Sequence, residues 1–256
     1  MTALTRPVLE CWPDVASRLR DAPRIALFLD FDGTLADLRP RPDQVSVDDR
    51  TRLALTALAG SPRFRIWIIS GRRQADLRDR VGLPGIRYLG LYGWEARGDK
   101  ELSEETRRAL ECLSAWMGAL LARKQGVWIE EKQHTLAVHH RGAPKEEAAL
   151  AGHIVNFVVR PFSDLFRIAP GKSVWEIMPW EMGDKGSAVR RELAALPPDT
   201  VPVYLGDDLS DEAAFAALPG GITVHIGGGR SSCAQYYLGG VSEVRTFLCK
   251  LEKEFG

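Results

Sequence analysis

The stretch that decides the fold is LFLDFDGTLADL, residues 27–38. Its first three residues are apolar and predict a strand buried within a sheet. That strand ends in two carboxylates, Asp30 and Asp32, with Gly33 directly after them. Ionised carboxylates at the end of a buried strand are costly unless a positive charge lies beside them. The stretch therefore predicts a buried strand together with a positively charged partner for its acids.

Short apolar runs and helical segments alternate on both sides of this stretch. Strands that alternate with helices indicate βαβ units, and continuous apolar runs are typical of a parallel sheet buried on both faces. We therefore expect an α/β fold with a Rossmann-like layered core and a mainly parallel sheet. The expected strands are 24–30, 64–70, 86–93, 201–208 and 221–227, and the expected helices are 48–60, 72–82, 184–196 and 210–218.

The middle of the chain has a different pattern. A helical segment is followed by two strands, and the same order is then repeated. This predicts a small α+β cap (αββαββ) over residues 100–178, inserted into a catalytic core made of 1–99 and 179–256. The cap would provide substrate specificity. Its expected helices are 103–124 and 144–160, and its expected strands are 126–132, 135–141, 165–171 and 173–179.

Composition excludes several classes of function. Lys plus Arg equal Asp plus Glu at 34 each, so no net charge favours nucleic acid or an anionic membrane as a partner. The four cysteines are far apart and show no C-x-x-C spacing, which favours a reducing compartment. No signal-peptide pattern and no run of about 20 apolar residues is present. We expect a cytoplasmic protein.

Polar residues follow three of the expected strands, at 30–34, 70–72 and 206–208. Because ligands bind at the carboxyl ends of the strands in an open parallel sheet, these three groups are expected at one edge. Lys185 begins the helix that precedes the third group. Each group alone has a structural alternative: an Asx turn, a Ser-Gly turn, a helix N-cap or a solvated lysine. All four in this order are far more specific, and together they predict a phosphoryl-transfer site.

The acids of this site have distinct expected roles. Asp30 and Asp207 offer the hard oxygen ligands that Mg²⁺ prefers, and the metal would supply positive charge where carboxylates converge. Asp30 could attack phosphorus and form an aspartyl-phosphate intermediate. Asp32 could protonate the leaving oxygen and later activate water.

The remaining motif residues would bind the phosphoryl group or support the acids. Gly33 lets the backbone approach the phosphoryl group and present its N–H. Ser70 can bind a phosphoryl oxygen through its hydroxyl, and Lys185 can neutralise charge on it. Four further residues are assigned beside them, the first two to substrate binding and the last two to support of the metal ligands or of a helix start: Gly71, Arg72, Asp208 and Asp211.

The set Asp30-x-Asp32-Gly-Thr, Ser70-Gly-Arg, Lys185-Gly and Gly-Asp207-Asp resembles the haloacid dehalogenase superfamily of Mg²⁺-dependent phosphatases. The position of the cap, between the second and third motifs, is similar to that superfamily's type-IIB cap. The resemblance implies that Asp30 is the nucleophile and a metal ligand. It implies that Asp32 is the acid and base with its carbonyl on the metal, and that Asp207 is a further ligand.

A closer resemblance is to the trehalose-6-phosphate phosphatase family. It rests on segments that include LYGWEAR (91–97), VWIEEKQHTLAVHHR (127–141) and GDDLSDEAAF (206–215). The family's sugar-contacting positions correspond here to four residues of the cap: Glu130, Lys132, Arg141 and Glu176. Such groups can hydrogen-bond sugar hydroxyls and hold an anionic phosphosugar. Cross-strand ion pairing on a wet sheet face is the alternative role for the same residues.

Three positions depart from the family pattern. Tyr92 stands where the family commonly has His in Gly-x-His-Gly, His140 stands for Tyr in His-Tyr-Arg, and Ser210 stands for Thr. Ser210 keeps a hydroxyl, so that change is chemically small. The other two fall where the sugar would be bound. Because neighbouring residues of a strand point to opposite faces, only one of His139 and His140 can face the site.

The expected function is Mg²⁺-dependent hydrolysis of trehalose 6-phosphate to trehalose and phosphate, as part of trehalose biosynthesis. The expected partner is a phosphosugar substrate, with a functional link to a sugar-phosphate synthase. Alternative substrates are sucrose phosphate, glucosylglycerol phosphate or a pseudo-disaccharide phosphate, and a phosphomutase is a further alternative. A non-catalytic regulatory domain should have lost part of the catalytic set, whereas all four of its members are present: Asp30, Asp32, Lys185 and Asp207.

Overall fold

The computed structural model describes residues 5–39, 41–97, 101–171, 173–228 and 231–256. The chain divides into two compact units, the first made of Met1–Gly98 and Asp184–Gly256 and the second of Asp99–Gly183. The boundaries expected from the sequence, 99/100 and 178/179, differ from these by a few residues. Within the described residues, no helix is long and apolar enough to cross a membrane.

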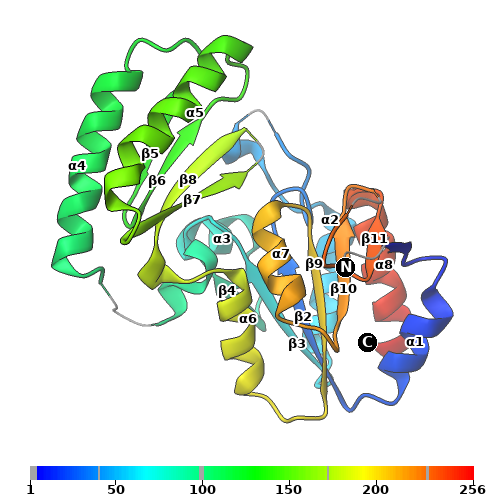
Figure 1. Cartoon of the computed structure of the whole chain (residues 1–256). Coiled ribbons are helices and arrows are strands. Elements are labelled where there is room, and N and C mark those ends of the chain that lie inside the picture. The colour runs from blue at the N-terminus through cyan, green and yellow to red at the C-terminus, as the bar shows by residue number, and fades with distance from the viewer. Residues whose placement is uncertain (1–4, 40, 98–100, 172, 229–230) are drawn as a thin grey trace. The chain divides into compact units, whose positions relative to one another are not determined.

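The first unit contains a seven-stranded sheet in the order β1-β11-β10-β9-β2-β3-β4 (Figure 1). Every neighbouring pair in it is parallel. The α/β class and the parallel sheet predicted from the sequence are therefore confirmed. The strands are β1 (Arg6–Pro7), β2 (Arg24–Asp30), β3 (Phe64–Ile69), β4 (Ile86–Leu89), β9 (Thr200–Gly206), β10 (Ile222–Ile226) and β11 (Tyr236–Leu238).

Helices cover both faces of this sheet, and successive side chains of β2 pack alternately against the helices on one face and on the other. Leu27 and Leu29 pack in a cluster with residues of four helices, α1 (Trp12–Arg20), α2 (Asp49–Gly60), α3 (Gln74–Val81) and α8 (Val241–Phe255). Phe28 points to the other face and packs with residues of α6 (Lys185–Ala194) and α7 (Leu209–Ala216). All three side chains are fully buried, which explains the unbroken apolar run in the sequence.

Among the described residues, four α-helices and strands of this unit were not expected from the sequence: β1, α1, β11 and α8. Helix α1 and strand β11 are short, and β11 has only three residues. Helix α8 carries buried residues at helical spacing, Val244, Phe247, Leu248 and Leu251, which is the pattern of an amphipathic helix. These elements complete the first face of the sheet and its β1 edge.

The second unit has the predicted αββαββ order. Its antiparallel sheet has the strand order β5-β6-β8-β7, and α4 and α5 pack on one face of it (Figure 1). Leu136, Val138 and Ile177 are buried beneath these helices. The elements are α4 (Glu104–Leu121), β5 (Trp128–Lys132), β6 (Thr135–His139), α5 (Lys145–Val159), β7 (Phe166–Gly171) and β8 (Val174–Pro179). That this unit selects the substrate stays a prediction.

Candidate active site

Three polar groups lie at the carboxyl edge of the parallel sheet. Asp30 is the last residue of β2, and Ser70 and Asp207 directly follow β3 and β9. Strand β2 lies between β9 and β3 in the sheet, so these three residues leave neighbouring strands at the same edge. The topology thus brings together residues that are up to 177 positions apart in sequence, since 207 − 30 = 177.

Lys185 reaches this edge from the first position of α6. A capping box between Asp184 and Ser187 fixes the start of that helix and so the direction of the lysine. The ammonium Nζ lies 2.7 Å from Oδ1 of Asp30 and 2.7 Å from Oδ1 of Asp211. The side chain is only 3% exposed. Lys185 is therefore a protein-borne positive partner for the acid that ends β2, and it is paired as buried charges must be.

Asp211 supports this lysine from helix α7. It forms a capping box with Asp208, whose backbone N–H donates to Oδ2 of Asp211 at 2.9 Å. The hydroxyl of Tyr204 donates to Oδ1 at 2.7 Å. Together with Lys185, three protein donors thus bind the two oxygens of Asp211. Asp211 thereby holds the ammonium of Lys185 beside Asp30, and its assignment to support of the metal ligands stays a prediction.

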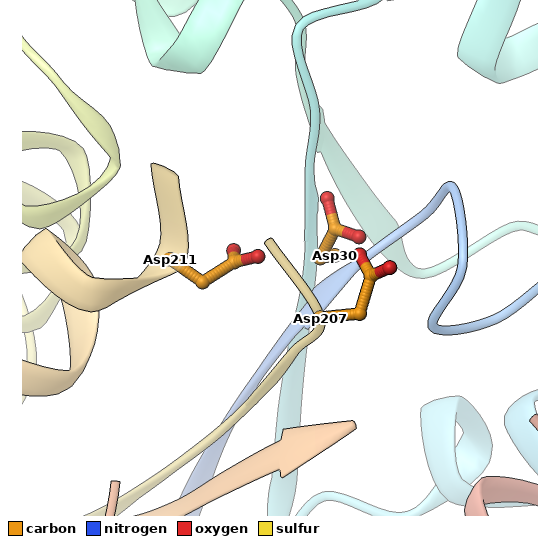
Figure 2. A group of neighbouring side chains, drawn as sticks. All are labelled: Asp30, Asp207 and Asp211. Atoms are coloured by element: carbon orange, nitrogen blue, oxygen red, sulfur yellow. The ribbon is translucent and has the colours of Figure 1, made fainter. Parts of the chain in front are cut away.

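Asp30, Asp207 and Asp211 converge, with one oxygen of each within 4.8 Å of the others (Figure 2). Oδ2 of Asp30 is buried and has no hydrogen-bond partner, an unusual state for a polar atom. Hard carboxylate oxygens around an unsatisfied buried oxygen fit a divalent cation. A cation would also balance the negative charge left after pairing with the single ammonium. Donors bind both oxygens of Asp211, whereas Oδ2 of Asp30 accepts no hydrogen bond.

Gly33 is required by this arrangement. Its φ is +84°, in the left-handed region that favours glycine. A Cβ at this position would lie 2.1 Å from Oδ2 of Asp207. Any side chain would therefore displace the Asp207 carboxylate, so the glycine of the motif leaves space for a charged group as well as permitting the turn.

Burial shifts the protonation of this cluster. Burial raises the pKa of Asp30 well above its ordinary value, and the charges of Asp211 and Asp207 raise it further although Lys185 opposes them. Burial disfavours the ammonium of Lys185, but the two carboxylates outweigh it and raise its pKa above the ordinary value. Burial and the nearby acids also raise the pKa of Tyr204. Lys185 therefore stays charged and Tyr204 keeps its donor proton.

Asp32, the second acid of the opening motif, is held by Arg72. The guanidinium binds both carboxylate oxygens, with Nε 2.6 Å from Oδ2 and Nη2 2.7 Å from Oδ1. Its third nitrogen, Nη1, lies 2.8 Å from Oδ2 of Asp76. The sequence analysis assigned Arg72 to substrate binding, whereas here its guanidinium binds two carboxylates of the protein.

Ser70 and Gly71 complete the loop after β3. The hydroxyl oxygen of Ser70 accepts a bond from the backbone N–H of Arg72 at 3.2 Å, which leaves its own O–H able to donate. A Cβ on Gly71 would lie 2.6 Å from the hydroxyl oxygen of Tyr92. Tyr92 has φ +58°, and its ring centroid lies 6.0 Å from Nζ of Lys185.

Tyr92 and Tyr204 are two residues near Lys185 and Asp211 to which the sequence analysis gave no role. The sequence did single out Tyr92, because it stands at a position that departs from the family pattern. Nothing in the sequence singled out Tyr204, because a tyrosine inside a buried strand is ordinary.

The cap residues assigned to the sugar lie within the second unit. Glu130 and Glu176 both pair with Ala137 of β6 in the sheet register, so they share one face, opposite α4 and α5. Lys132 forms an ion pair with Glu176. Arg141 is exposed in the turn after β6.

His139 and His140 point to opposite faces, as the alternation of a strand requires. Nε2 of His139 lies 2.9 Å from Oε2 of Glu130, and its ring stacks on Trp128 with centroids 3.9 Å apart. His140 instead stacks on Trp175. His139 is therefore the histidine on the face of Glu130, a residue choice that the sequence left open.

A parallel sheet with converging acids at its carboxyl edge, in a chain with an inserted α+β unit, is the arrangement of the haloacid dehalogenase class of hydrolases. Comparison with protein families narrows this class. The trehalose-phosphatase family model matches residues 28–227, and the chain belongs to that family.

Known proteins agree with this placement. The trehalose-phosphate phosphatase of Mycobacterium marinum is 32% identical over 247 residues, which cover 91% of this chain and 62% of that protein. This chain therefore spans less than two thirds of the length of that relative.

Two solved structures show the same fold. The C-terminal domain of Candida albicans trehalose-6-phosphate phosphatase superposes with a TM-score of 0.82 at 21% identity, covering 98% of this chain and 100% of that one. The C-terminal domain of the C. albicans trehalose synthase regulatory protein superposes with a TM-score of 0.72 at 14% identity, covering 96% and 99%. At these identities the likeness is one of fold alone.

Proposed function

We propose that the chain is a Mg²⁺-dependent phosphatase that hydrolyses trehalose 6-phosphate to trehalose and inorganic phosphate. The observation that carries the proposal is the buried group at the sheet edge, where Lys185 binds one oxygen of Asp30 and leaves the other without a partner. An available carboxylate oxygen beside a fixed positive charge is what nucleophilic attack on a phosphate ester requires. Membership in the trehalose-phosphatase family supports the choice of substrate.

The residues divide the reaction into two steps. In the first, an oxygen of Asp30 forms a bond to phosphorus while the ester P–O bond breaks, and a proton from Asp32 goes to the leaving sugar oxygen. In the second, Asp32 takes a proton from water as the water oxygen attacks the aspartyl-phosphate, which releases phosphate and restores Asp30. Lys185 and the hydroxyl of Ser70 would stabilise the phosphoryl oxygens.

A magnesium ion would be held by Asp30 and Asp207, with the backbone carbonyl of Asp32 as a third protein ligand. When bound, it supplies positive charge that screens the phosphate from the carboxylates and stabilises charge on the phosphoryl oxygens. Hard oxygen donors favour Mg²⁺ over softer metals.

The sugar would be bound by Glu130, Lys132, Arg141 and Glu176 of the cap. Glu130, Lys132 and Glu176 lie on one face of the cap sheet and Arg141 lies in the turn after β6, and their charges suit hydroxyl groups and an anionic ester. The pairing of Lys132 with Glu176 is also what a purely structural ion pair would show. Only substrate selectivity separates these two roles.

We further propose a cytoplasmic location and a functional link to a synthase that makes the sugar phosphate. The four free cysteines support a reducing compartment. A trehalose 6-phosphate phosphatase needs an enzyme that joins a glucosyl donor to a glucose phosphate.

A second candidate is a non-catalytic domain, because a regulatory protein shares the fold. Against it stands the complete set of Asp30, Asp32, Lys185 and Asp207. The test is phosphate release from a panel of sugar phosphates, with Mg²⁺ and with EDTA. Trehalose 6-phosphate is expected to give the highest kcat/KM, and EDTA should remove the activity.

Asp30→Asn is the control for this assay, matched by Asp199→Asn, which changes a half-exposed acid that pairs with Arg24. Activity that survives Asp30→Asn or EDTA would contradict the mechanism. A preference for sucrose phosphate or a monosaccharide phosphate would contradict the substrate assignment while leaving the chemistry in place.

A further inference from the structure

Arg72 has more contacts with protein carboxylates than a phosphate-binding residue needs. All three of its guanidinium nitrogens lie within 2.8 Å of a carboxylate oxygen, two on Asp32 and one on Asp76. The side chain is only 13% exposed, and the guanidinium also lies over the ring of Phe31, 5.4 Å from its centroid. The arginine is therefore fixed on several sides by its own unit.

The second carboxylate in this chain of contacts is itself anchored. Asp76 lies on α3, and its Oδ1 accepts a bond from Nε of Arg80 at 2.8 Å. Arg80 also donates to the backbone carbonyls of Asp43 and Val45. Contacts between alternating negative and positive side chains thus join the loop after β2 to helix α3, in the order Asp32, Arg72, Asp76 and Arg80.

We propose that Arg72 is a positioning residue that fixes the carboxylate of Asp32 for proton transfer and does not itself bind the phosphoryl group. This inference rests on the proposed phosphatase chemistry, in which Asp32 gives a proton to the leaving oxygen. A bidentate arginine–carboxylate pair sets the plane of the carboxylate as well as its position. An acid that is 30% exposed would otherwise rotate among several orientations.

The two roles of Arg72 predict different kinetics. A phosphate ligand stabilises the same phosphoryl group in every substrate, so its loss should lower kcat/KM equally for all leaving groups. A residue that acts through Asp32 matters only where the leaving oxygen needs a proton. Its loss should be severe for a poor leaving group and small for a good one, because kcat/KM reports the step in which the ester bond breaks.

The test compares phenyl phosphate with p-nitrophenyl phosphate, in the presence of Mg²⁺. The nitro group stabilises the departing phenolate, so p-nitrophenyl phosphate needs little help from an acid. For Arg72→Gln we expect kcat/KM to fall about 10- to 100-fold on phenyl phosphate, part of the ~10²–10⁴ that a general acid contributes, and by less than about threefold on p-nitrophenyl phosphate. Equal losses on the two esters would overturn the inference.

Arg80→Gln is the matched control, because Arg80 shares Asp76 with Arg72 and the other hydrogen bonds of its guanidinium go to the backbone carbonyls of Asp43 and Val45 instead of to Asp32. It should change the ratio of the two rates less than Arg72→Gln does, because Arg72 keeps both of its bonds to Asp32. If Arg80→Gln changed the ratio as strongly as Arg72→Gln, the effect would belong to the loop as a whole and not to the Arg72–Asp32 pair.

A double-mutant cycle with Asp32→Asn tests whether Arg72 acts through that acid. If it does, Asp32→Asn alone should show the same dependence on the leaving group, and adding Arg72→Gln should cost no more than about twofold further on phenyl phosphate. Multiplicative losses would show an independent role and overturn the inference.

These aryl esters also separate the inference from the sugar assignment. If the wild-type chain hydrolysed both esters normally but not trehalose 6-phosphate, only the assignment of the substrate would be overturned. Failure of the wild type on trehalose 6-phosphate and on both esters would overturn the phosphatase chemistry and the role of Arg72 with it.

Discussion

Two ion clusters of similar composition lie in the two units, and they differ in burial. In the core, Lys185 is 3% exposed and lies 2.7 Å from each of two acids, Asp30 and Asp211. In the cap, Lys132 is 16% exposed and pairs with the largely buried Glu176, and Glu130 on the same face is 42% exposed. A lysine among acids thus forms a fully desolvated cluster in the core, whereas the cap cluster reaches from a largely buried ion pair to a partly hydrated acid, Glu130.

From this difference in burial we infer that the reaction takes place at the core cluster and that the cap cluster selects the substrate. Electrostatic interactions are strong and fixed in a desolvated site, which suits the stabilisation of charge at a reacting phosphorus. Partly hydrated acids and amines exchange partners at little cost, which suits the binding of sugar hydroxyls. We therefore expect changes in the core cluster to affect every substrate and changes in the cap cluster to affect the sugar phosphate alone.

The largest expected effect is that of Asp30→Asn. An amide cannot act as the nucleophile, so kcat should fall by at least about a thousandfold on trehalose 6-phosphate and on p-nitrophenyl phosphate alike. Phosphate release under saturating substrate measures both. A loss of activity on the sugar phosphate alone would contradict the division of roles between the two clusters, because the core would then be selecting the substrate.

The next effect concerns stability. Lys185→Met leaves Asp30 and Asp211 buried without their counter-charge, and breaking such a buried pair costs about 3–5 kcal/mol of the free energy of unfolding. The matched change Lys132→Met should cost about 1–2 kcal/mol, because Lys132 is 16% exposed, against 3% for Lys185, and water can reach the place of the lost ammonium. Urea denaturation in metal-free buffer measures both variants, and equal costs would contradict the contrast in burial.

Metal binding should stabilise the core without involving the cap. At a Mg²⁺ concentration about 100-fold above its Kd, the gain in unfolding free energy is about 2.7 kcal/mol, which thermal or urea denaturation detects. Asp207→Asn should remove most of this gain, whereas Glu176→Gln should keep it. If Glu176→Gln removed the gain as well, the cation would not belong to the core cluster.

The smallest expected effect sharpens the role of the cap. Glu130→Gln should lower kcat/KM for trehalose 6-phosphate about 10- to 100-fold, the loss expected for one or two hydrogen bonds that involve a charged group, and leave p-nitrophenyl phosphate unchanged. Glu131→Gln is the matched control, since Glu131 is the next residue of β5 and its side chain instead bonds Ser114. Equal effects of the two variants on the sugar phosphate would contradict a sugar contact at Glu130.

The sequence was sufficient for the fold class and for the residues at the strand ends. Asp30 and Asp207 could be placed because each directly follows an apolar run, and the carboxyl ends of parallel strands share one edge. Lys185 could be placed by its position at the start of a helix. These predictions depend on local patterns that tertiary packing preserves.

Other parts of the site depend on contacts that no local pattern encodes. Tyr204 points to the α6 and α7 face of its strand, where its hydroxyl meets Asp211, and nothing in its neighbours shows this. The partners of Arg72 depend on how two loops pass each other. Strand β11, with three residues, is too short to show a period.

The most direct test of the central claim is to trap the covalent intermediate. The chain is mixed with ³²P-labelled trehalose 6-phosphate and Mg²⁺, quenched in acid within milliseconds and digested, and the labelled peptide is identified. We predict label on the peptide that contains Asp30 and none in Asp30→Asn. Label on another residue, or rapid turnover without any labelled peptide, would contradict the account in which Asp30 of the buried core cluster is the nucleophile.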